Sequence, residues 1–211
     1  MMNKKENISA AVVKRLPRYY HCLKELSTEG IQKVSSNIIS GRLNITASQV
    51  RQDFSTFGEF GQQGYGYDVE YLKVQIAKIL GLNKEYSAIV IGGGNIGRAL
   101  CGYKGFKNEG FNILAVFDLY PEKVKAPANI EVLNIAKLND FVKNNTVDIG
   151  IIATDVESAK EVGAIAVKCG IKAIWNFAPI DLYLGEDIAV ENINMSESLF
   201  MLAYKLNLLG K

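Results

Sequence analysis

Six consecutive residues have the composition of a main-chain binding site for phosphate groups. They lie between a short apolar run and a segment of helical character, and they are Gly92, Gly93, Gly94, Asn95, Ile96 and Gly97. In a G-x-G-x-x-G turn the first glycine permits a tight bend, the second lets the backbone approach a pyrophosphate, and the third lets helix and strand pack closely. Free N–H groups at the start of the helix then attract the phosphates, so residues 92–97 predict a dinucleotide site.

An acidic residue follows at the spacing expected for ribose recognition. Asp118 ends the next apolar run, 21 residues after Gly97. A carboxylate at this position hydrogen-bonds the adenosine ribose hydroxyls and repels a 2′-phosphate. The alternative, a surface acid at the end of a strand, explains the spacing less well. Asp118 therefore favours NADH and NAD⁺ as cofactors over their phosphorylated forms.

The residues needed for catalysis by such a domain do not accompany this site. A Rossmann domain is not by itself an enzyme, and a dehydrogenase needs a group that moves a proton, such as His, Lys or an activated Tyr. The single histidine, His21, lies far upstream, and Tyr103 with Lys107 falls too close to the glycines to match the Tyr/Lys pair of short-chain dehydrogenases. We expect a sensor rather than an enzyme. We also expect no metal site, because the three cysteines form no C-x-x-C pair.

The elements that position these residues alternate between strands and helices from residue 86 onward. Short apolar runs at 87–93, 111–118, 147–154 and 172–177 are typical of buried parallel strands. The segments 97–106 and 158–170 between them have helical patterns. This β-α-β alternation predicts an α/β fold with a Rossmann-type parallel sheet.

The first part of the chain predicts a winged helix-turn-helix domain. Ser9 can cap a first helix whose apolar positions are spaced by three and four and which Gly30 can end; those positions are Val12, Leu16, Tyr20, Leu23 and Leu26. Ser35 or Ser36 can cap a short second helix over 36–43, and Thr46 a third over 47–57. The glycine- and aromatic-rich stretch 58–67 predicts a hairpin, the wing, before a helix over 68–81.

The third predicted helix carries the candidate DNA contacts. Its polar face presents Ser48, Gln49, Arg51 and Gln52, and Arg and Gln suit the base edges of the major groove. Residues 1–57 hold nine Lys and Arg against four Asp and Glu, whereas residues 86–211 hold twelve against fourteen. An ordinary solvated helix face is an equally good interpretation of these residues alone. The basic N-terminal part nevertheless favours nucleic acid as a partner.

The predicted organisation has three parts. Residues 1–81 form the winged-helix domain, residues 82–195 the Rossmann domain, and residues 196–211 a C-terminal dimerisation helix with Leu199, Leu202, Leu206 and Leu209 on one stripe. Docking of that helix on its own Rossmann domain is the alternative. No apolar run approaches the roughly 18 residues of a membrane span, and the start MMNKKENISA is polar. We therefore expect a cytoplasmic protein without a membrane partner.

Eight blocks of residues along the chain occur together, in the same order, in a known family. They are Arg15-Leu16-Pro17-Arg18-Tyr19-Tyr20, Val34-Ser35-Ser36, Val50 to Ser55, Phe57 to Gly61, Gly64 to Tyr67, the glycine motif, Phe117-Asp118 and Asn176-Phe177-Ala178-Pro179. In these blocks the chain resembles the Rex family of redox-sensing transcriptional repressors. The resemblance implies a homodimer with swapped C-terminal helices, NADH bound near the dimer centre, and release of a palindromic double-stranded DNA operator when NADH accumulates. It also places Tyr103 near the nicotinamide and Ser35, Gln62 and Gln63 at the DNA.

Four departures from the family pattern bear on the redox response. His21 stands where the family usually has Arg, and Asn194 where it usually has Asp. In the family these two residues and the tyrosine at Tyr103 form the ligand-coupled network between domains, so their replacement predicts a weaker response. Gln62-Gln63 replaces a Lys-Arg pair in the wing, and Ala153-Thr154-Asp155 replaces a Thr-Val-Pro loop.

Two competing functions remain from the sequence. The first is a small NAD-dependent oxidoreductase with a helical appendage. The second is a CoA-binding Rossmann protein, because such domains also use glycine-rich turns. Asp118 argues against the second.

Overall fold

The computed structural model describes residues 9–57, 61–62 and 65–210. Its contacts divide the chain into two compact units, Met1–Lys84 and Glu85–Lys211. The predicted domain division after residue 81 falls close to this junction. The assignment of one function to each unit remains a prediction at this point.

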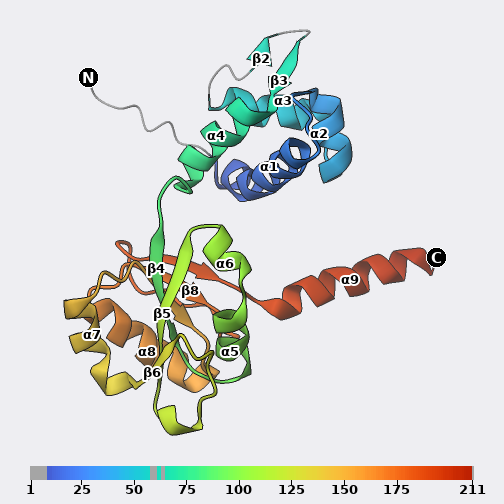
Figure 1. Ribbon diagram of the computed structural model, residues 1–211. Coiled ribbons are helices and arrows are strands. Elements are labelled where there is room, and N and C mark those ends of the chain that lie inside the picture. The colour runs from blue at the N-terminus through green and yellow to red at the C-terminus, as the bar shows by residue number, and fades with distance from the viewer. Residues whose placement is uncertain (1–8, 58–60, 63–64, 211) are drawn as a thin grey trace. The chain divides into compact units, whose positions relative to one another are not determined.

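Unit 1 is built on four helices, coloured blue to green in Figure 1. They are α1 (Ala10–Thr28), α2 (Ser36–Leu43), α3 (Ala47–Ser55) and α4 (Val69–Leu80). The predicted caps are confirmed, because the side chains of Ser9, Ser35 and Thr46 each accept a hydrogen bond from a main-chain N–H in the first turn. These contacts fix where each helix begins.

A small antiparallel sheet completes unit 1. Its strands are β1 (Lys33–Val34), β2 (Gly61–Gln62) and β3 (Gly66–Asp68), in the order β1-β3-β2. The sequence predicts the pairing of β2 with β3 but not β1, which is too short to produce a pattern. The remainder of the predicted hairpin, residues 58–60 and 63–64, lies outside the described residues.

The core of unit 1 joins α1 to α3 and α4. Tyr19 and Phe54 are both buried, and their ring centres lie 4.8 Å apart. The predicted apolar position Tyr20 is half-buried and packs against this core, while its neighbour Tyr19, which the pattern does not predict, is fully buried. Two adjacent tyrosines satisfy a helical spacing of three or four equally well, so the pattern alone could not separate them.

Unit 2 contains a six-stranded parallel sheet, which confirms the predicted fold class. The strands are β4 (Tyr86–Ile91), β5 (Phe111–Asp118), β6 (Glu131–Asn134), β7 (Ile149–Ile152), β8 (Ala173–Asn176) and β9 (Ala189–Asn192). Their order is β6-β5-β4-β7-β8-β9. The order therefore reverses at β4, which has β5 on one side and β7 on the other.

Helices cover both faces of this sheet (Figure 1). The helices α5 (Asn95–Gly102) and α6 (Gly105–Asn108) cover one face, and α7 (Leu138–Asn144) and α8 (Val156–Lys168) cover the other. Two short 3₁₀ turns, η1 (Pro121–Lys123) and η2 (Ile135–Lys137), flank β6. The predicted helix over 97–106 begins earlier, at Asn95, and is broken in two by the extended residue Tyr103.

The last helix, α9 (Met195–Leu209), has no described residue that is buried by the rest of the chain. Leu199, Leu202, Leu206 and Leu209 of the predicted stripe are 61–84% exposed. Further large apolar residues occupy its other faces, namely Phe200, Met201, Tyr204 and Leu208. Among the described residues every helix falls short of the length or apolar character that spanning a bilayer requires.

Candidate dinucleotide site and DNA-contacting helix

The turn between β4 and α5 requires glycine at two positions. Gly92 has a φ of +103°, and a Cβ there would lie 2.6 Å from the carbonyl oxygen of Ala153. A Cβ at Gly97 would overlap the carbonyl oxygen of Gly92. Gly94 caps α5 without any side-chain contact, and the space around its Cα is open. The start of α5 is thus accessible to a phosphate group, as the motif predicts.

Asp118 ties the end of β5 to this turn. Its Oδ2 accepts a hydrogen bond from the main-chain N–H of Gly93 at 2.7 Å, and its Oδ1 accepts one from Tyr120 at 2.9 Å. The sequence predicts a ribose contact for Asp118, and these two bonds are an additional, positional role. Because each carboxylate oxygen has two lone pairs, both oxygens can still accept a bond from a ligand.

A pocket of about 460 Å³ opens beside the turn. Its lining combines parts of the glycine turn with Asp118 and residues that follow β5 and β7; it comprises Ile91, Gly92, Gly94, Phe117, Asp118, Leu119, Tyr120, Ile135, Ala153, Thr154, Asp155, Ser158, Glu161, Val162 and Ile165. The pocket lies at the carboxyl ends of β5, β4 and β7, where the strand order reverses. Ligands of doubly wound sheets bind at this place.

The chemistry of the pocket divides into a polar and an apolar part. Ile135, Val162 and Ile165 offer apolar surface that a flat base could cover. Asp155 caps α8, and its Oδ1 accepts a hydrogen bond from the N–H of Ser158 at 2.8 Å. This main-chain bond lowers the pKa of Asp155, which is therefore ionised in neutral solution. The departure noted at 153–155 thus places a negative charge in the pocket.

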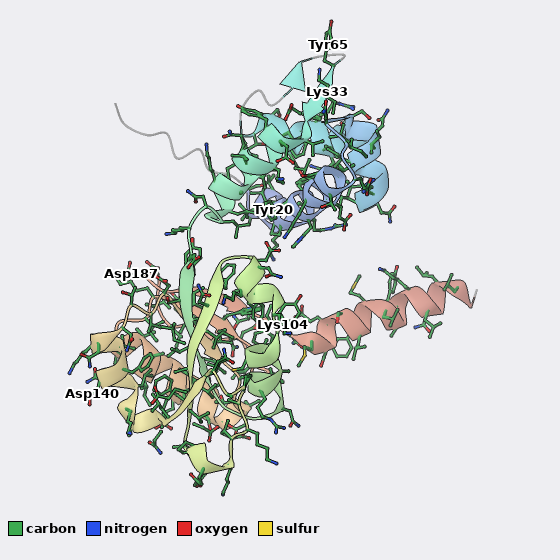
Figure 2. All side chains as sticks on the ribbon, viewed as in Figure 1. Tyr20, Lys33, Tyr65, Lys104, Asp140 and Asp187 are labelled. Atoms are coloured by element: carbon green, nitrogen blue, oxygen red, sulfur yellow. The ribbon has the colours of Figure 1, made fainter. Side chains whose placement is uncertain are left out.

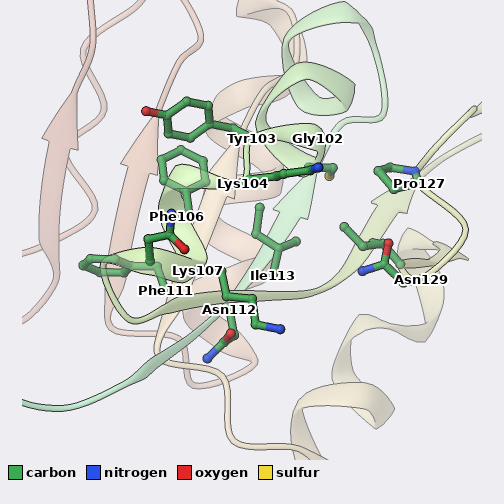
Figure 3. A pocket seen from close by; sticks show the side chains of 13 residues that line it. Gly102, Tyr103, Lys104, Phe106, Lys107, Phe111, Asn112, Ile113, Pro127 and Asn129 are labelled. Atoms are coloured by element: carbon green, nitrogen blue, oxygen red, sulfur yellow. The ribbon is translucent and has the colours of Figure 1, made fainter.

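Five of the eight predicted cofactor residues do not line this pocket, namely Gly93, Asn95, Ile96, Gly97 and Tyr103. Gly93 and Gly97 belong to the glycine turn itself. Asn95 begins α5, and its side chain accepts a hydrogen bond from Arg98, while Ile96 is half-buried beside it. Tyr103 is 61% exposed and lines a second pocket of about 480 Å³, together with Phe106 and Lys107 (Figure 3). The structure therefore does not bring Tyr103 to the glycine turn and Asp118.

The exposed face of α3 in unit 1 agrees in part with the predicted DNA contacts. Ser48, Arg51 and Gln52 are exposed. Gln49 is half-buried, and its amide donates a hydrogen bond to Asp53 Oδ1 at 2.7 Å, so it points inward rather than along the exposed face. Ser35 is exposed at the start of α2. The side chain of Gln62 on β2, and the whole of Gln63, lie outside the described residues.

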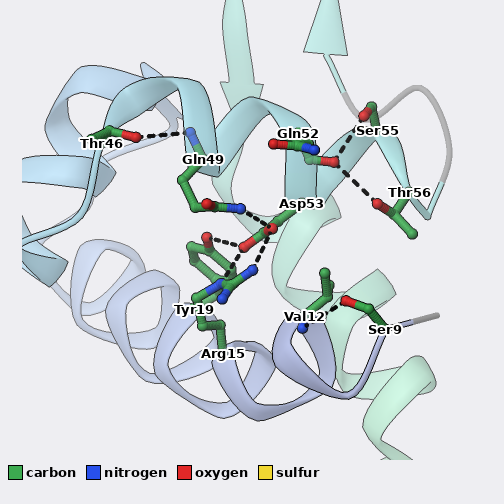
Figure 4. Close-up of polar contacts among 10 residues, drawn as sticks. All are labelled: Ser9, Val12, Arg15, Tyr19, Thr46, Gln49, Gln52, Asp53, Ser55 and Thr56. Atoms are coloured by element: carbon green, nitrogen blue, oxygen red, sulfur yellow. Dashed lines mark hydrogen bonds and ion pairs between the residues drawn. The ribbon is translucent and has the colours of Figure 1, made fainter.

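Asp53 is a functional candidate that the sequence analysis missed. Its buried carboxylate accepts bonds from Arg15 Nε at 2.6 Å, Arg15 Nη2 at 2.8 Å and the Tyr19 hydroxyl at 2.7 Å (Figure 4). These bonds fasten α3 to α1. The available signal was an acid on the apolar face of the helix, three residues after Val50.

The hydrogen bonds keep Asp53 ionised although it is buried. Burial by itself would raise the pKa of Asp53, but the bonds from Arg15, Tyr19 and Gln49 more than offset that effect and lower the pKa below its usual value. Burial and the Asp53 contact raise the pKa of Tyr19 well above the usual tyrosine range. The cluster thus holds an ion pair of Asp53 with Arg15 beneath the exposed face of α3.

Comparison with known proteins finds a family model that matches part of each unit, and relatives that match nearly the whole chain. Residues 7–55 match a family model described as a putative DNA-binding protein N-terminus, and residues 83–180 match one described as a CoA binding domain. Over 207 residues the chain is 48% identical to the redox-sensing transcriptional repressor Rex of Clostridium tetani (strain Massachusetts / E88), covering 98% of both chains. The chain belongs to the Rex family.

Solved structures of Rex-family proteins have the same fold as this Rex chain. The repressor RSP in complex with β-NAD⁺ and operator DNA matches with a TM-score of 0.88 and 44% identity, covering 95% of this chain and 93% of RSP. RSP in complex with β-NADH matches with a TM-score of 0.86 and 41% identity, covering 96% of both chains. The expected winged-helix and Rossmann fold is thereby confirmed.

The predicted coupling residues of this Rex chain lie in different units. His21 is exposed on α1, and its ring centre lies 5.9 Å from that of Tyr20. Asn194 caps α9, and its Oδ1 accepts a hydrogen bond from the N–H of Ser196 at 3.1 Å. An aspartate would serve equally well at such a cap, so the departure at Asn194 removes a charge without removing the cap.

Proposed function

We propose that this chain is a DNA-binding transcriptional repressor that senses the NADH/NAD⁺ ratio and releases its operator when NADH binds unit 2. The observation that carries the proposal is the pocket in which the open glycine turn meets Asp118. The Rex-family repressor RSP, with 41–44% identity, is known in complex with NADH and with NAD⁺ and operator DNA. We assign a binding role rather than a catalytic one to this chain, because its relatives are transcriptional repressors.

The residues of the pocket fit a dinucleotide. The free N–H groups at the start of α5 would bind the pyrophosphate, since a side chain at Gly94 would only obstruct them. Asp118 would accept hydrogen bonds from the hydroxyls of the adenosine ribose. Ile135, Val162 and Ile165 would cover the adenine. The nicotinamide, when bound, supplies the difference in charge between the two redox forms.

A second ligand class comes from the family model for residues 83–180, which is described as a CoA binding domain. CoA also contains an adenosine diphosphate part, but its ribose carries a phosphate. Asp118 would repel that phosphate, so we assign the pocket to NADH and NAD⁺. Displacement of bound NADH by an equal concentration of CoA would contradict this assignment.

Unit 1 would bind a two-fold symmetric operator as part of a homodimer. Ser48, Arg51 and Gln52 on α3 would face the major groove, and Ser35 would contact a phosphate. Replacing Arg51 by Ala should weaken operator binding by about 1–3 kcal/mol if Arg51 contacts a base. Fluorescence anisotropy on duplexes changed at single base pairs measures this. An equal loss on every duplex would assign Arg51 to the phosphates instead.

Replacing Asp118 by Ala should weaken NADH binding by about 1–2 kcal/mol, the loss of charge-assisted hydrogen bonds to the ribose. The wild type should bind NADH much more tightly than NADPH. In the variant the ratio of the two affinities should be smaller. Calorimetry with both nucleotides separates the two roles of Asp118. If its contact with Gly93 were its whole role, both affinities would fall equally.

The departures at His21 and Asn194 should make the redox response weaker than in relatives with Arg and Asp at these positions. A His–Asn contact near neutral pH carries no charge pair, and allosteric coupling is typically only about 1–3 kcal/mol. The double variant His21→Arg/Asn194→Asp should therefore lower the NADH concentration for half-release of DNA, more than either single variant does. An unchanged half-release concentration would mean that another contact performs the coupling.

A mobility-shift assay on duplexes with palindromic operators tests the proposed function. The protein–DNA complex should persist with NAD⁺ and disappear with NADH. A complex that responds to neither nucleotide would contradict the sensing role, and turnover of NADH without DNA binding would support the oxidoreductase alternative.

A further inference from the structure

Two exposed side chains on the small sheet of unit 1 contact each other. Lys33 lies on β1, and Tyr65 directly precedes β3. The Lys33 ammonium lies 5.7 Å from the centre of the Tyr65 ring, and the Tyr65 side chain is 71% exposed. Figure 2 labels both residues at the end of unit 1 where this sheet lies. We call them the Lys33–Tyr65 pair.

The backbone of the sheet fixes the position of this pair. β1 and β3 are antiparallel, with Val34 opposite Tyr67. Gly66, the first residue of β3, has a φ of +75°. A Cβ at Gly66 would lie 2.7 Å from the carbonyl oxygen of Val34. The close approach of the two strands therefore depends on Gly66. Tyr65 directly precedes Gly66, and its side chain meets that of Lys33.

The positive charge of Lys33 is not neutralised within the described part of the chain. Asp68 lies opposite Lys33 in the register of the two strands. Its Oδ1 instead accepts a hydrogen bond from the N–H of Tyr71 at 2.8 Å and caps α4. No described carboxylate is within ion-pair distance of Lys33, whose contact is the face of the Tyr65 ring.

Hydrogen bonding links the segment of Lys33 to the helix that carries the candidate base contacts. Arg51 on α3 donates a hydrogen bond to the Ser36 hydroxyl at 3.1 Å. Ser36 begins α2, three residues after Lys33. The exposed face of α3, the start of α2 and the Lys33–Tyr65 pair are thus neighbouring parts of one surface.

We propose that the Lys33–Tyr65 pair binds the sugar–phosphate backbone of DNA beside the groove contacted by α3. This inference rests on the proposed function. An ammonium group on a mobile stem binds phosphate as a point charge, and the ring face that holds it limits the positions it can adopt. The exposed ring edge and hydroxyl of Tyr65 suit a deoxyribose and a phosphate oxygen. Such contacts orient a protein on DNA but carry no base information.

The test is the salt dependence of binding to two duplexes, one with a palindromic operator and one of random sequence and equal length. Each phosphate contact contributes about 0.9 to the slope of log K against log salt. Lys33→Ala should lower the magnitude of that slope by about 0.9 per subunit. When the salt concentration is raised from about 50 to about 200 mM, the variant should therefore lose less affinity than the wild type, by a factor of about three per subunit. The change should be the same on both duplexes.

Variants of Tyr65 test the role of the ring. Tyr65→Ala should lower the slope in the same direction, because the ammonium is no longer held, whereas Tyr65→Phe should keep it. Lys33→Arg should also keep it. Lys78→Ala is the matched control, since Lys78 is exposed at the end of α4 that is far from β3. The salt slope of this variant should equal that of the wild type. Circular dichroism verifies that each variant is folded.

Failure of the Lys33–Tyr65 contact and failure of the proposed function give different results. If the wild type binds operator DNA and Lys33→Ala keeps its slope, the Lys33–Tyr65 pair does not contact phosphate and only this inference is wrong. The same holds if Lys33→Ala changes oligomeric state but not the slope, which would assign the pair to a protein contact. If the wild type binds neither duplex, the proposed function fails together with the inference.

Discussion

Removal of residues 196–211 should abolish dimerisation and reduce operator affinity by about 10²–10⁴-fold. None of the described residues of α9 is buried, and nine large apolar side chains on it are 54–84% exposed. An apolar surface of this extent is not stable in water and marks an interface. Because two half-sites bound by one dimer gain affinity through their linkage, a monomer would lose that gain. Sedimentation and operator anisotropy of the truncated chain measure the two effects.

A milder variant of the full chain separates loss of the interface from loss of the helix. Leu202→Glu/Leu206→Glu places two charges on one face of α9 and should produce the monomer, with the reduced DNA affinity of the truncated chain. Asn207→Glu, on a different face, should leave the dimer intact. If the truncated chain remained a dimer with full DNA affinity, α9 would have no role in assembly, and docking on its own unit would be the better interpretation.

Replacing Arg15 by Met should lower the free energy of unfolding of unit 1 by about 2–3 kcal/mol. The Asp53 side chain is 1% exposed, and Arg15 supplies two of its hydrogen bonds. Removing one partner of a buried ion pair costs about 3–5 kcal/mol because the other charge remains buried. The bonds from Tyr19 and Gln49 persist and reduce that cost. Amide hydrogen exchange in α1 and α3 of the full chain measures the change.

The double variant Arg15→Met/Asp53→Asn provides the control. It removes the buried charge together with its partner, so it should lose less stability than the sum of the two single variants. Additive losses would show that the ion pair contributes nothing beyond its separate residues. Arg15→Met should also weaken operator binding, because α3 then keeps only the Tyr19 bond of its polar contacts from Asp53 to α1. A purely local loss would leave DNA affinity unchanged.

The lowered pKa of Asp53 predicts the pH dependence of unit 1. A group whose pKa is lower in the folded state contributes its full stability above its unfolded pKa, which is about 3.9 for Asp, and that contribution is lost as the pH falls through the lowered value. Hydrogen-exchange protection of α1 and α3 should therefore decrease below about pH 4. The decrease should be smaller in Asp53→Asn, which has no carboxylate to protonate.

The sequence predicts the strands that contain an apolar run and misses those that do not. The run 111–118 becomes β5 with the same bounds, because a largely apolar run of eight residues that begins after Gly110 and ends in Asp118 allows few alternatives. β6 and β9 have only four residues each and contain Glu and Asn, so they produce no apolar run. β9 lies at the edge of the sheet, where polar residues are tolerated.

The candidate sites show the same division between local and distant contacts. The glycine turn and Asp118 are joined over 25 residues by a geometry that recurs in Rossmann folds, so spacing alone predicts it. Arg15 and Asp53 are 38 residues apart, and no sequence pattern pairs them. The predicted helix breaks at Tyr103, whose ring lies against Gly105 at a place where a Cβ would overlap it. Such packing becomes visible only in three dimensions.

Operator binding at a constant total concentration of NADH and NAD⁺, with their ratio varied, tests the central claim most directly. The nucleotides should compete for the pocket of Asp118, with opposite effects on DNA affinity. The account predicts that the fraction of fluorescent operator duplex bound falls as the NADH/NAD⁺ ratio rises, and that doubling the total nucleotide at a fixed ratio leaves it unchanged. A bound fraction that follows total nucleotide, or that responds to neither quantity, would contradict it.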